Sequence, residues 1–224
     1  MEKIIFEAIN VNGKKRSLFS GNKFALENIN FQLPTGYIMG IIGENGAGKT
    51  TFFNYVMNER KKYHGQFLLV GEDISKDHVW TMNNVGFVSE ENQFIRQRTI
   101  KQNAELLGPF YECFDMELFL QILDEAGVPA GKNIFGLSKG ENMKFQLAFA
   151  VAHNPKLLLV DEATAGMDMI YRKEFYRLLR RLLDKREISV IMSSHLEDDI
   201  QKQFDYIGYF KKGRLMFFKE NELN

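Results

Sequence analysis

The chain is poor in cysteine, carries no excess charge of either sign and has no long apolar run. Its single cysteine, Cys113, excludes an internal disulfide framework and is typical of a reducing compartment. Lys and Arg together number 29, as do Asp and Glu, so the net charge favours neither a nucleic acid nor an anionic membrane as a partner. No apolar run approaches the ~20 residues that span a bilayer, and the opening MEKIIFEAIN lacks the apolar core of a signal peptide. We therefore expect a cytoplasmic protein that binds no nucleic acid and reaches a membrane only through another chain.

The clearest motif is a glycine-rich loop at residues 43–50, which matches G-x-x-x-x-G-K-[ST] at every position. A strand-like apolar run precedes it, and a run able to form a helix follows. In such a loop the backbone N–H groups and the positive end of the helix bind phosphates. Lys49 would bridge the terminal phosphates and the Thr50 hydroxyl would be a ligand for Mg²⁺. This context disfavours a mere glycine turn and predicts a nucleoside triphosphate site made of Gly43, Glu44, Asn45, Gly46, Ala47, Gly48, Lys49, Thr50 and Thr51.

Alternating strands and helices are predicted along the whole chain. Strands are expected at 4–9, 26–33, 37–42, 66–70, 85–88, 157–160 and 188–192, with a terminal hairpin at 206–210 and 215–218. Helices are expected at 50–56, 116–126, from 138 toward 153, and at 168–185. The predicted fold is α/β: a P-loop NTPase core with a mostly parallel sheet flanked by helices, N-terminal antiparallel strands and a small helical subdomain. We expect one domain, with the core at 1–92 and 138–224 and the helical subdomain at about 93–137.

Two acidic residues follow a strand that is apolar throughout. The run 157–160 is typical of a central strand buried on both faces, and Asp161 and Glu162 come directly after it. A carboxylate at the end of this strand can supply the second anchor for Mg²⁺, and its neighbour can orient and deprotonate the attacking water. A strand that simply ends in a solvated acidic turn is the alternative, and the phosphate-binding loop in the same chain disfavours it.

Ser138 and Glu141 form the S-x-x-E pattern of a helix capping box. The pattern by itself is compatible with an ordinary helix start. A capped helix N-terminus with a free hydroxyl and N–H groups is also able to bind an anion. The pattern alone leaves both interpretations open.

The glycine-rich loop, LSKGE at 137–141, LLLVDEATAGMD at 157–168 and a histidine after the next strand occur in this order. In this combination the sequence resembles the ATPase domain of an ABC transporter over essentially its whole length. The resemblance implies that Asp161 is the Walker B aspartate and Glu162 the catalytic glutamate. It also implies that Asp168 belongs to the loop that crosses a dimer interface, and that His195 is the switch histidine that senses the γ-phosphate.

The resemblance further implies a head-to-tail dimer, in which residues 137–141 of one copy close over ATP held by the other. Residues Ser138, Lys139, Gly140 and Glu141 would then contact ATP. The adenine-stacking aromatic of the family matches Phe19 best and Phe24 next, although packing in the core is a nearly equal alternative.

Four positions depart from the usual pattern of the family. Lys139 and Glu141 replace a glycine and a glutamine of the signature, and Ala163 replaces a proline. Glu90 falls where a glutamine normally contacts Mg²⁺, although Glu91 or Gln93 are alternatives for that role. We expect Lys139 to add a positive charge near the triphosphate. Glu141 would repel the phosphates unless capping holds it back.

The resemblance implies a Mg²⁺-dependent ATPase subunit on the inner face of the cell membrane. Its partners would be a second copy or a homologous subunit and a separate permease, docked in a groove at about 90–110. The compact subdomain, the residues around 108–111 and the short C-terminus favour a bacterial export type. A soluble ABC ATPase of translation or DNA repair is the alternative, but a second ATPase domain and long coiled coils are missing from the sequence. The absence of N-K-x-D disfavours a GTPase, and the retained Glu162 and His195 disfavour a silent regulator.

Overall fold

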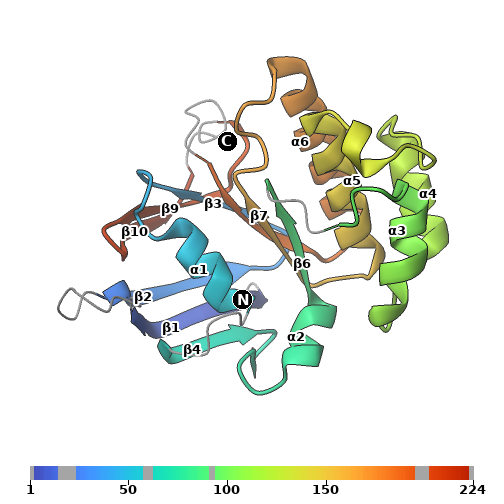
Figure 1. Cartoon of the computed structure of the whole chain (residues 1–224). Coiled ribbons are helices and arrows are strands. Elements are labelled where there is room, and N and C mark those ends of the chain that lie inside the picture. Colours follow the sequence, from blue (N-terminus) through green and yellow to red (C-terminus); the bar gives the residue numbers. More distant parts are fainter. Residues whose placement is uncertain (1–2, 15–23, 58–62, 91–93, 195–201, 222–224) are drawn as a thin grey trace.

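The computed structural model describes residues 3–14, 24–57, 63–90, 94–194 and 202–221, which form two sheets and the helices around them (Figure 1). The antiparallel sheet has the order β2-β1-β4-β5 and contains β1 (Ile4–Lys14), β2 (Phe24–Pro34), β4 (Tyr63–Leu69) and β5 (Glu72–Asp73). The second sheet has the order β10-β9-β3-β8-β7-β6 and contains β3 (Ile38–Ile42), β6 (Val85–Ser89), β7 (Leu157–Asp161), β8 (Ser189–Ser193), β9 (Tyr206–Lys211) and β10 (Arg214–Glu220). Its strands are parallel except for β10, which forms the predicted hairpin with β9.

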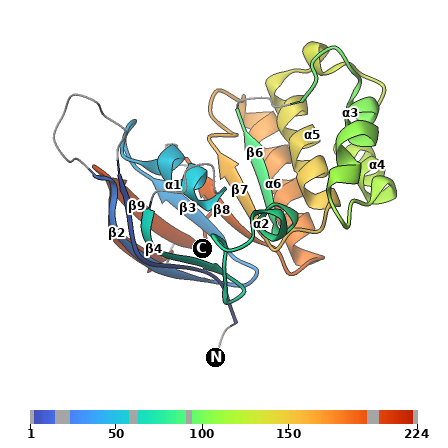
Figure 2. The same cartoon turned by 60° about the horizontal axis from the view of Figure 1, so that its bottom comes forward.

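The helices cluster on the side of the parallel sheet that faces away from the antiparallel one (Figures 1 and 2). The described helices are α1 (Lys49–Val56), α2 (His78–Asn84), α3 (Ile100–Leu107), α4 (Met116–Glu125), α5 (Lys139–Ala152) and α6 (Met169–Asp184), with the short 3₁₀ helices η1 (Gly108–Phe110) and η2 (Ile134–Gly136). The main exception is α1, which lies between the two sheets. Among the described residues, no helix has both the length and the apolar character that a bilayer crossing requires.

Alternation along the parallel strands divides the apolar core into two clusters. In β7, Leu158 and Val160 pack with α3 to α6, whereas Leu157 and Leu159 pack with α1 and the antiparallel sheet. Because all four side chains are fully buried, β7 reads as a continuous apolar run, as a central parallel strand does. The glycine-rich loop therefore connects β3 to a helix, α1, that is fixed between two layers.

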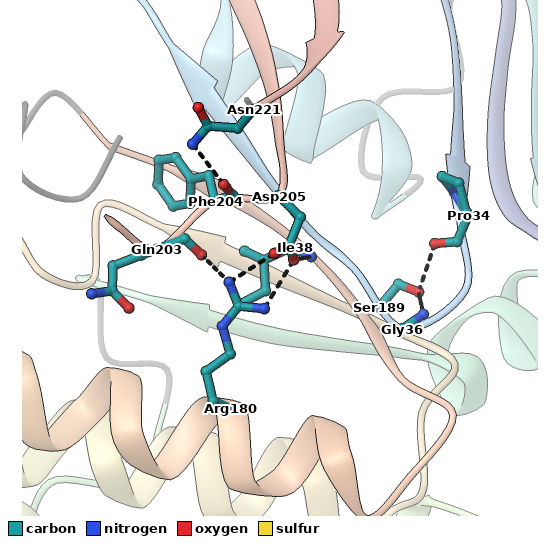
Figure 3. Close-up of polar contacts among 9 residues, drawn as sticks. All are labelled: Pro34, Gly36, Ile38, Arg180, Ser189, Gln203, Phe204, Asp205 and Asn221. Carbon is teal, nitrogen blue, oxygen red and sulfur yellow. Dashed lines mark hydrogen bonds and ion pairs between the residues drawn. The ribbon is translucent and has the colours of Figure 1, made fainter. Parts of the chain in front are cut away.

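Helix α6 is joined to the sheet by one charged side chain (Figure 3). The guanidinium of Arg180 donates to both carboxylate oxygens of Asp205, at 2.9 and 3.0 Å, and to the carbonyl oxygen of Gln203 at 2.6 Å. Asp205 also accepts the backbone N–H of Ile38 at the start of β3. A paired, bidentate contact of this kind fixes geometry more strongly than a single ion pair. It ties α6 to the strand that leads into the glycine-rich loop.

Helical structure dominates residues 94–137, where α3, η1, α4 and η2 follow one another. Helix α4 packs against α5, and α3 and α4 share one apolar cluster with α5 and α6. This arrangement agrees with the predicted helical character of the stretch. The division into a core and a separate subdomain stays a prediction.

Candidate functional site

The glycine-rich loop connects β3 to α1 and encloses the ammonium group of Lys49. The side chain of Lys49 is 4% exposed, and its Nζ donates to the carbonyl oxygens of Gly43 at 2.7 Å and Glu44 at 3.3 Å. Gly43 has a φ of 152°, and a Cβ there would lie 2.3 Å from the carbonyl oxygen of Phe210. Gly48 has a φ of 115° as N-cap of α1, a conformation that favours glycine. The path of the loop therefore requires glycine at both positions, and its role in binding phosphate stays a prediction.

The two acidic residues at the end of β7 lie beside this loop, as predicted. The Oε1 of Glu162 lies 3.8 Å from Nζ of Lys49. Burial raises the pKa of Asp161, and the Glu162 charge adds to this effect, whereas hydrogen bonds from Ser193 and Thr50 and the Lys49 charge lower it. A cation bound at Asp161 would reverse the effect of burial.

The oxygen ligands at this point fit Mg²⁺. Asp161 is partly buried and its pKa is lowered by a hydrogen bond from the Thr50 hydroxyl, so a carboxylate and a hydroxyl oxygen share one location. The described residues contain no cluster of three or more potential metal-ligating side chains. Mg²⁺ typically takes one or two protein oxygens and completes its shell with substrate phosphates and waters. The pair of Thr50 and Asp161 matches this binding mode.

A serine that was not predicted connects the two acidic residues. Ser193 ends β8, and its hydroxyl donates to Oδ1 of Asp161 at 2.6 Å. The hydroxyl oxygen of Ser193 in turn accepts the backbone N–H of Glu162 at 2.8 Å. A signal was present in the sequence, because Ser193 is the polar end of a buried strand, two residues before His195.

The capping box predicted at the start of α5 is present. Ser138 accepts the N–H of Glu141 at 3.2 Å, and Glu141 accepts the N–H of Ser138 at 2.8 Å. Lys132 also donates to both carboxylate oxygens of Glu141, at 2.9 and 2.8 Å. These hydrogen bonds, the one from Lys132 foremost, lower the pKa of Glu141. Capping and Lys132 together therefore hold the Glu141 charge beside the exposed side chain of Ser138.

Two of the positions that depart from the family pattern contact each other. Nζ of Lys139 lies 2.8 Å from Oε1 of Glu90, which is 60% exposed. Both residues line a polar cavity of about 390 Å³, which Arg96, Phe135, Ser138 and Asn142 also line. Glu90 is therefore placed near the α5 N-terminus, and its contact with Mg²⁺ stays a prediction.

The strand end before Glu90 is held by α5. The amide of Gln146, which is 4% exposed, accepts the N–H of Ser89 at 3.1 Å and donates to the Ser89 carbonyl at 3.0 Å. One side chain thus makes both backbone hydrogen bonds that a neighbouring strand would make. This contact fixes α5 relative to the end of β6.

Asp168 is the N-cap of α6 and accepts the N–H groups of Ile170 and Tyr171, at 2.9 and 3.1 Å. Tyr171 packs against Gly140, where an added Cβ would lie 3.1 Å from its ring. The predicted residues Asp168 and Ser138–Glu141 therefore lie on one surface, next to the exposed side chains of Met169 and Ile170.

Several predicted residues lie outside the described part of the chain. They are Phe19, the alternatives Glu91 and Gln93, and His195. Phe24 begins β2. The predicted roles of these residues stay predictions.

A family model described as ABC transporter matches residues 26–165. The chain belongs to the ABC transporter family. The dimeric post-hydrolysis structure of the ATP-binding cassette MJ0796 bound to ADP and Pi has the same fold as this chain. The two superpose with a TM-score of 0.85 at 22% identity, over 98% of this chain and 99% of that one.

Relatives of this chain are named for different transport systems. The bacitracin transport ATP-binding protein BcrA of Bacillus licheniformis is 29% identical over 198 residues, which are 88% of this chain and 65% of BcrA. The phosphate import ATP-binding protein PstB of Campylobacter jejuni is 31% identical over 224 residues, which cover 92% of this chain and 89% of PstB. The chain thus spans less than two thirds of the length of BcrA.

Proposed function

We propose that this ABC ATPase hydrolyses ATP as a head-to-tail dimer and thereby drives substrate transport through a separate transmembrane permease. The observation that carries the proposal is the meeting of Lys49, Asp161 and Glu162 at one edge of the sheet. A phosphate-binding cation, a metal ligand and a general base then surround the same point. In this assignment Glu162 orients and deprotonates the water, and His195 senses the γ-phosphate. Bound Mg²⁺, held by Thr50 and Asp161, would neutralise charge on the phosphates.

The second copy is needed because the α5 N-terminus lies beside Glu90 and Asp168 on an exposed surface. Ser138, Lys139 and Gly140 offer a hydroxyl group, an ammonium group and helix N–H groups there. These are groups that bind a triphosphate. The exposed apolar side chains of Met169 (59%) and Ile170 (69%) on the same surface suit contact with another chain.

The permease is proposed to dock in an apolar cavity of about 420 Å³ between α2, η1 and α5. It is lined by His78, Val79, Met82, Asn83, Phe94, Leu107, Phe110, Tyr111 and Phe149. The structure sorts the predicted docking residues: Ile100 is fully buried core, whereas Phe110 is 80% exposed. This position would place the chain at the cytoplasmic face of the membrane. We propose export as the direction of transport because residues 94–137 are compact. The relatives do not decide the direction, because they are named for different transport systems.

A mixing experiment tests the base and the dimer together. We expect Glu162→Gln to lower kcat by about 10²–10⁴-fold, because a general base is lost while the phosphate contacts remain. Ser138→Phe should also be inactive, since it blocks the composite site. In the proposed head-to-tail dimer, each site takes Glu162 from one copy and Ser138 from the other. When one copy carries Glu162→Gln and the other carries Ser138→Phe, one site therefore contains both substitutions and the other site contains neither.

Mixing the two inactive chains should therefore restore a substantial fraction of the turnover measured per intact site. Glu187→Gln, at an exposed glutamate that pairs with Lys3 at 3.6 Å, is the matched control and should be fully active. Full turnover in the Glu162→Gln variant alone would refute the assignment of Glu162 as the general base. Absence of recovery in the mixture, with both variants folded by circular dichroism, would refute the head-to-tail arrangement.

A further inference from the structure

The last residue of β8 joins the two acidic residues of the site through one hydroxyl group. Ser193 is fully buried, and it donates its only proton to Asp161 while it accepts the N–H of Glu162. A serine hydroxyl has one donor and two acceptor positions, so both contacts form at once. Because β8 lies between β3 and β7, Ser193 also stands between the glycine-rich loop and the acidic residues.

The backbone of Glu162 needs such a contact. Its φ is 50°, in the left-handed region, where a residue with a side chain is strained. Such a conformation persists only when its surroundings hold it in place. The hydrogen bond from the Glu162 N–H to Ser193 is a contact of this kind, and it decides where the side chain points, here toward Lys49.

The same strand carries a matched serine at its other end. Ser189 is also fully buried, and its hydroxyl accepts the N–H of Gly36 at 2.8 Å and donates to the carbonyl of Pro34 at 3.2 Å (Figure 3). Both serines therefore connect β8 to a neighbouring loop with one donated and one accepted hydrogen bond. They differ in that only Ser193 contacts the acidic residues.

We propose that Ser193 is a positioning residue for ATP hydrolysis. Its hydroxyl group fixes the backbone of Glu162 and the carboxylate of Asp161 relative to each other. The inference rests on the proposed roles of these two residues. Ser193 itself does not reach the reacting atoms. Its removal should leave ATP binding to the glycine-rich loop in place and misplace the base, so the effect should fall on kcat.

Steady-state kinetics of Ser193→Ala, Ser193→Thr and Ser189→Ala test the proposal. Loss of a hydrogen bond to a charged group corresponds to about a 10- to 100-fold change, and we expect Ser193→Ala to lower kcat in this range with little change in KM for ATP. Ser193→Thr, which keeps the hydroxyl, should recover most of the loss. Ser189→Ala should lose a similar amount of thermal stability and keep the wild-type kcat. Wild-type kcat in Ser193→Ala, an equal loss in Ser189→Ala, or no recovery in a stable Ser193→Thr would overturn the proposal.

A measurement on the nucleotide-free protein separates position from activity. In Ser193→Ala the Glu162 amide should exchange its hydrogen with solvent faster, by about tenfold or more for a lost hydrogen bond, and Ser193→Thr should restore protection. Unchanged exchange would overturn the structural half of the proposal.

In the Glu162→Gln background, Ser193→Ala should lower the residual kcat by no more than about twofold, since coupled residues are not additive. Full additivity would show that Ser193 does not act through Glu162. Failure of the proposed function is distinguishable, because it would appear as wild-type turnover in Glu162→Gln itself.

Discussion

At the scale of single residues, three lysines at or near the site each lie beside a glutamate of the same chain. Lys49 lies near Glu162, Lys139 pairs with Glu90, and Lys132 pairs with Glu141. A triphosphate and its metal must therefore exchange partners with groups that are already neutralised. The ion pairs keep the binding residues in place before the nucleotide arrives. Because each pair must be exchanged for a contact with the ligand, each pair also influences the affinity for the ligand.

The pair of Lys139 and Glu90 leads to a prediction about the metal requirement. Glu90→Gln should raise the Mg²⁺ concentration for half-maximal ATPase activity, because a charged oxygen near the metal is lost. Lys139→Ala should lower it, because Glu90 is released from its partner. An exposed ion pair contributes about 0–1 kcal/mol, so both shifts should stay within about fivefold.

Mg²⁺ titrations of the ATPase activity at saturating ATP measure both shifts. Lys101→Ala removes another exposed ion pair, with Glu105 at 3.8 Å on α3, and is the control. Curves of wild type and Glu90→Gln that superimpose would mean that the carboxylate does not reach the metal.

At the scale of elements, local sequence signals determine where helices begin. The expected helices start and end within a residue or two of α1, α4, α5 and α6. Helices α2 and α3 were not predicted, although both carry an N-cap signal. Thr99 and Gln102 form a capping box at α3, and Asp77 caps α2 through the N–H of Trp80. These helices are 7 and 8 residues long, too short to show a clear apolar period.

The C-terminal end of α5 leads to a prediction about stability and pH. His153 is 2% exposed and stacks on Tyr111 with ring centroids 4.3 Å apart. Burial lowers the pKa of His153 to about 4 from its ordinary 6.5, although backbone contacts with Val85 and Phe149 partly oppose this. Between these pH values the unfolded chain binds a proton that the folded chain does not, so stability falls as the pH falls.

From about pH 7.5 to 5.5, His153 should contribute a loss of roughly 1 to 1.5 kcal/mol in the free energy of unfolding. Urea denaturation of wild type and His153→Phe at both pH values checks this. The variant keeps an aromatic ring on Tyr111, and its stability should depend less on pH by that amount. Equal pH dependence in the two proteins would contradict the assignment.

At the scale of the whole molecule, the sequence predicted the order of motifs and the layers better than the contacts between distant segments. The glycine-rich loop and the acidic strand end were predictable because each is a local pattern with its own chemistry. Ser193 and Gln146 were not, because their roles depend on which strand and helix become neighbours. The contact between Lys139 and Glu90 joins residues 49 positions apart for the same reason.

The apolar cavity between α2, η1 and α5 leads to a prediction about assembly. Phe110→Glu should abolish co-purification with the proposed permease partner, because a charge would enter an apolar contact. Basal ATPase activity should stay within about twofold, since surface substitutions change stability little. Met216→Glu, at a residue 55% exposed on β10, is the control. Retained co-purification of the Phe110 variant would place the docking site elsewhere.

The contact between Gln146 and Ser89 has a consequence for solubility. Strand β6 is an outer strand of the six-stranded sheet, and an outer strand exposes N–H and C=O groups on which another chain can add a strand. The amide of Gln146 occupies both groups of Ser89 at the end of β6, and α5 packs along the strand. Another chain therefore finds both backbone groups of Ser89 occupied, and this end of the β6 edge is protected from the addition of a strand.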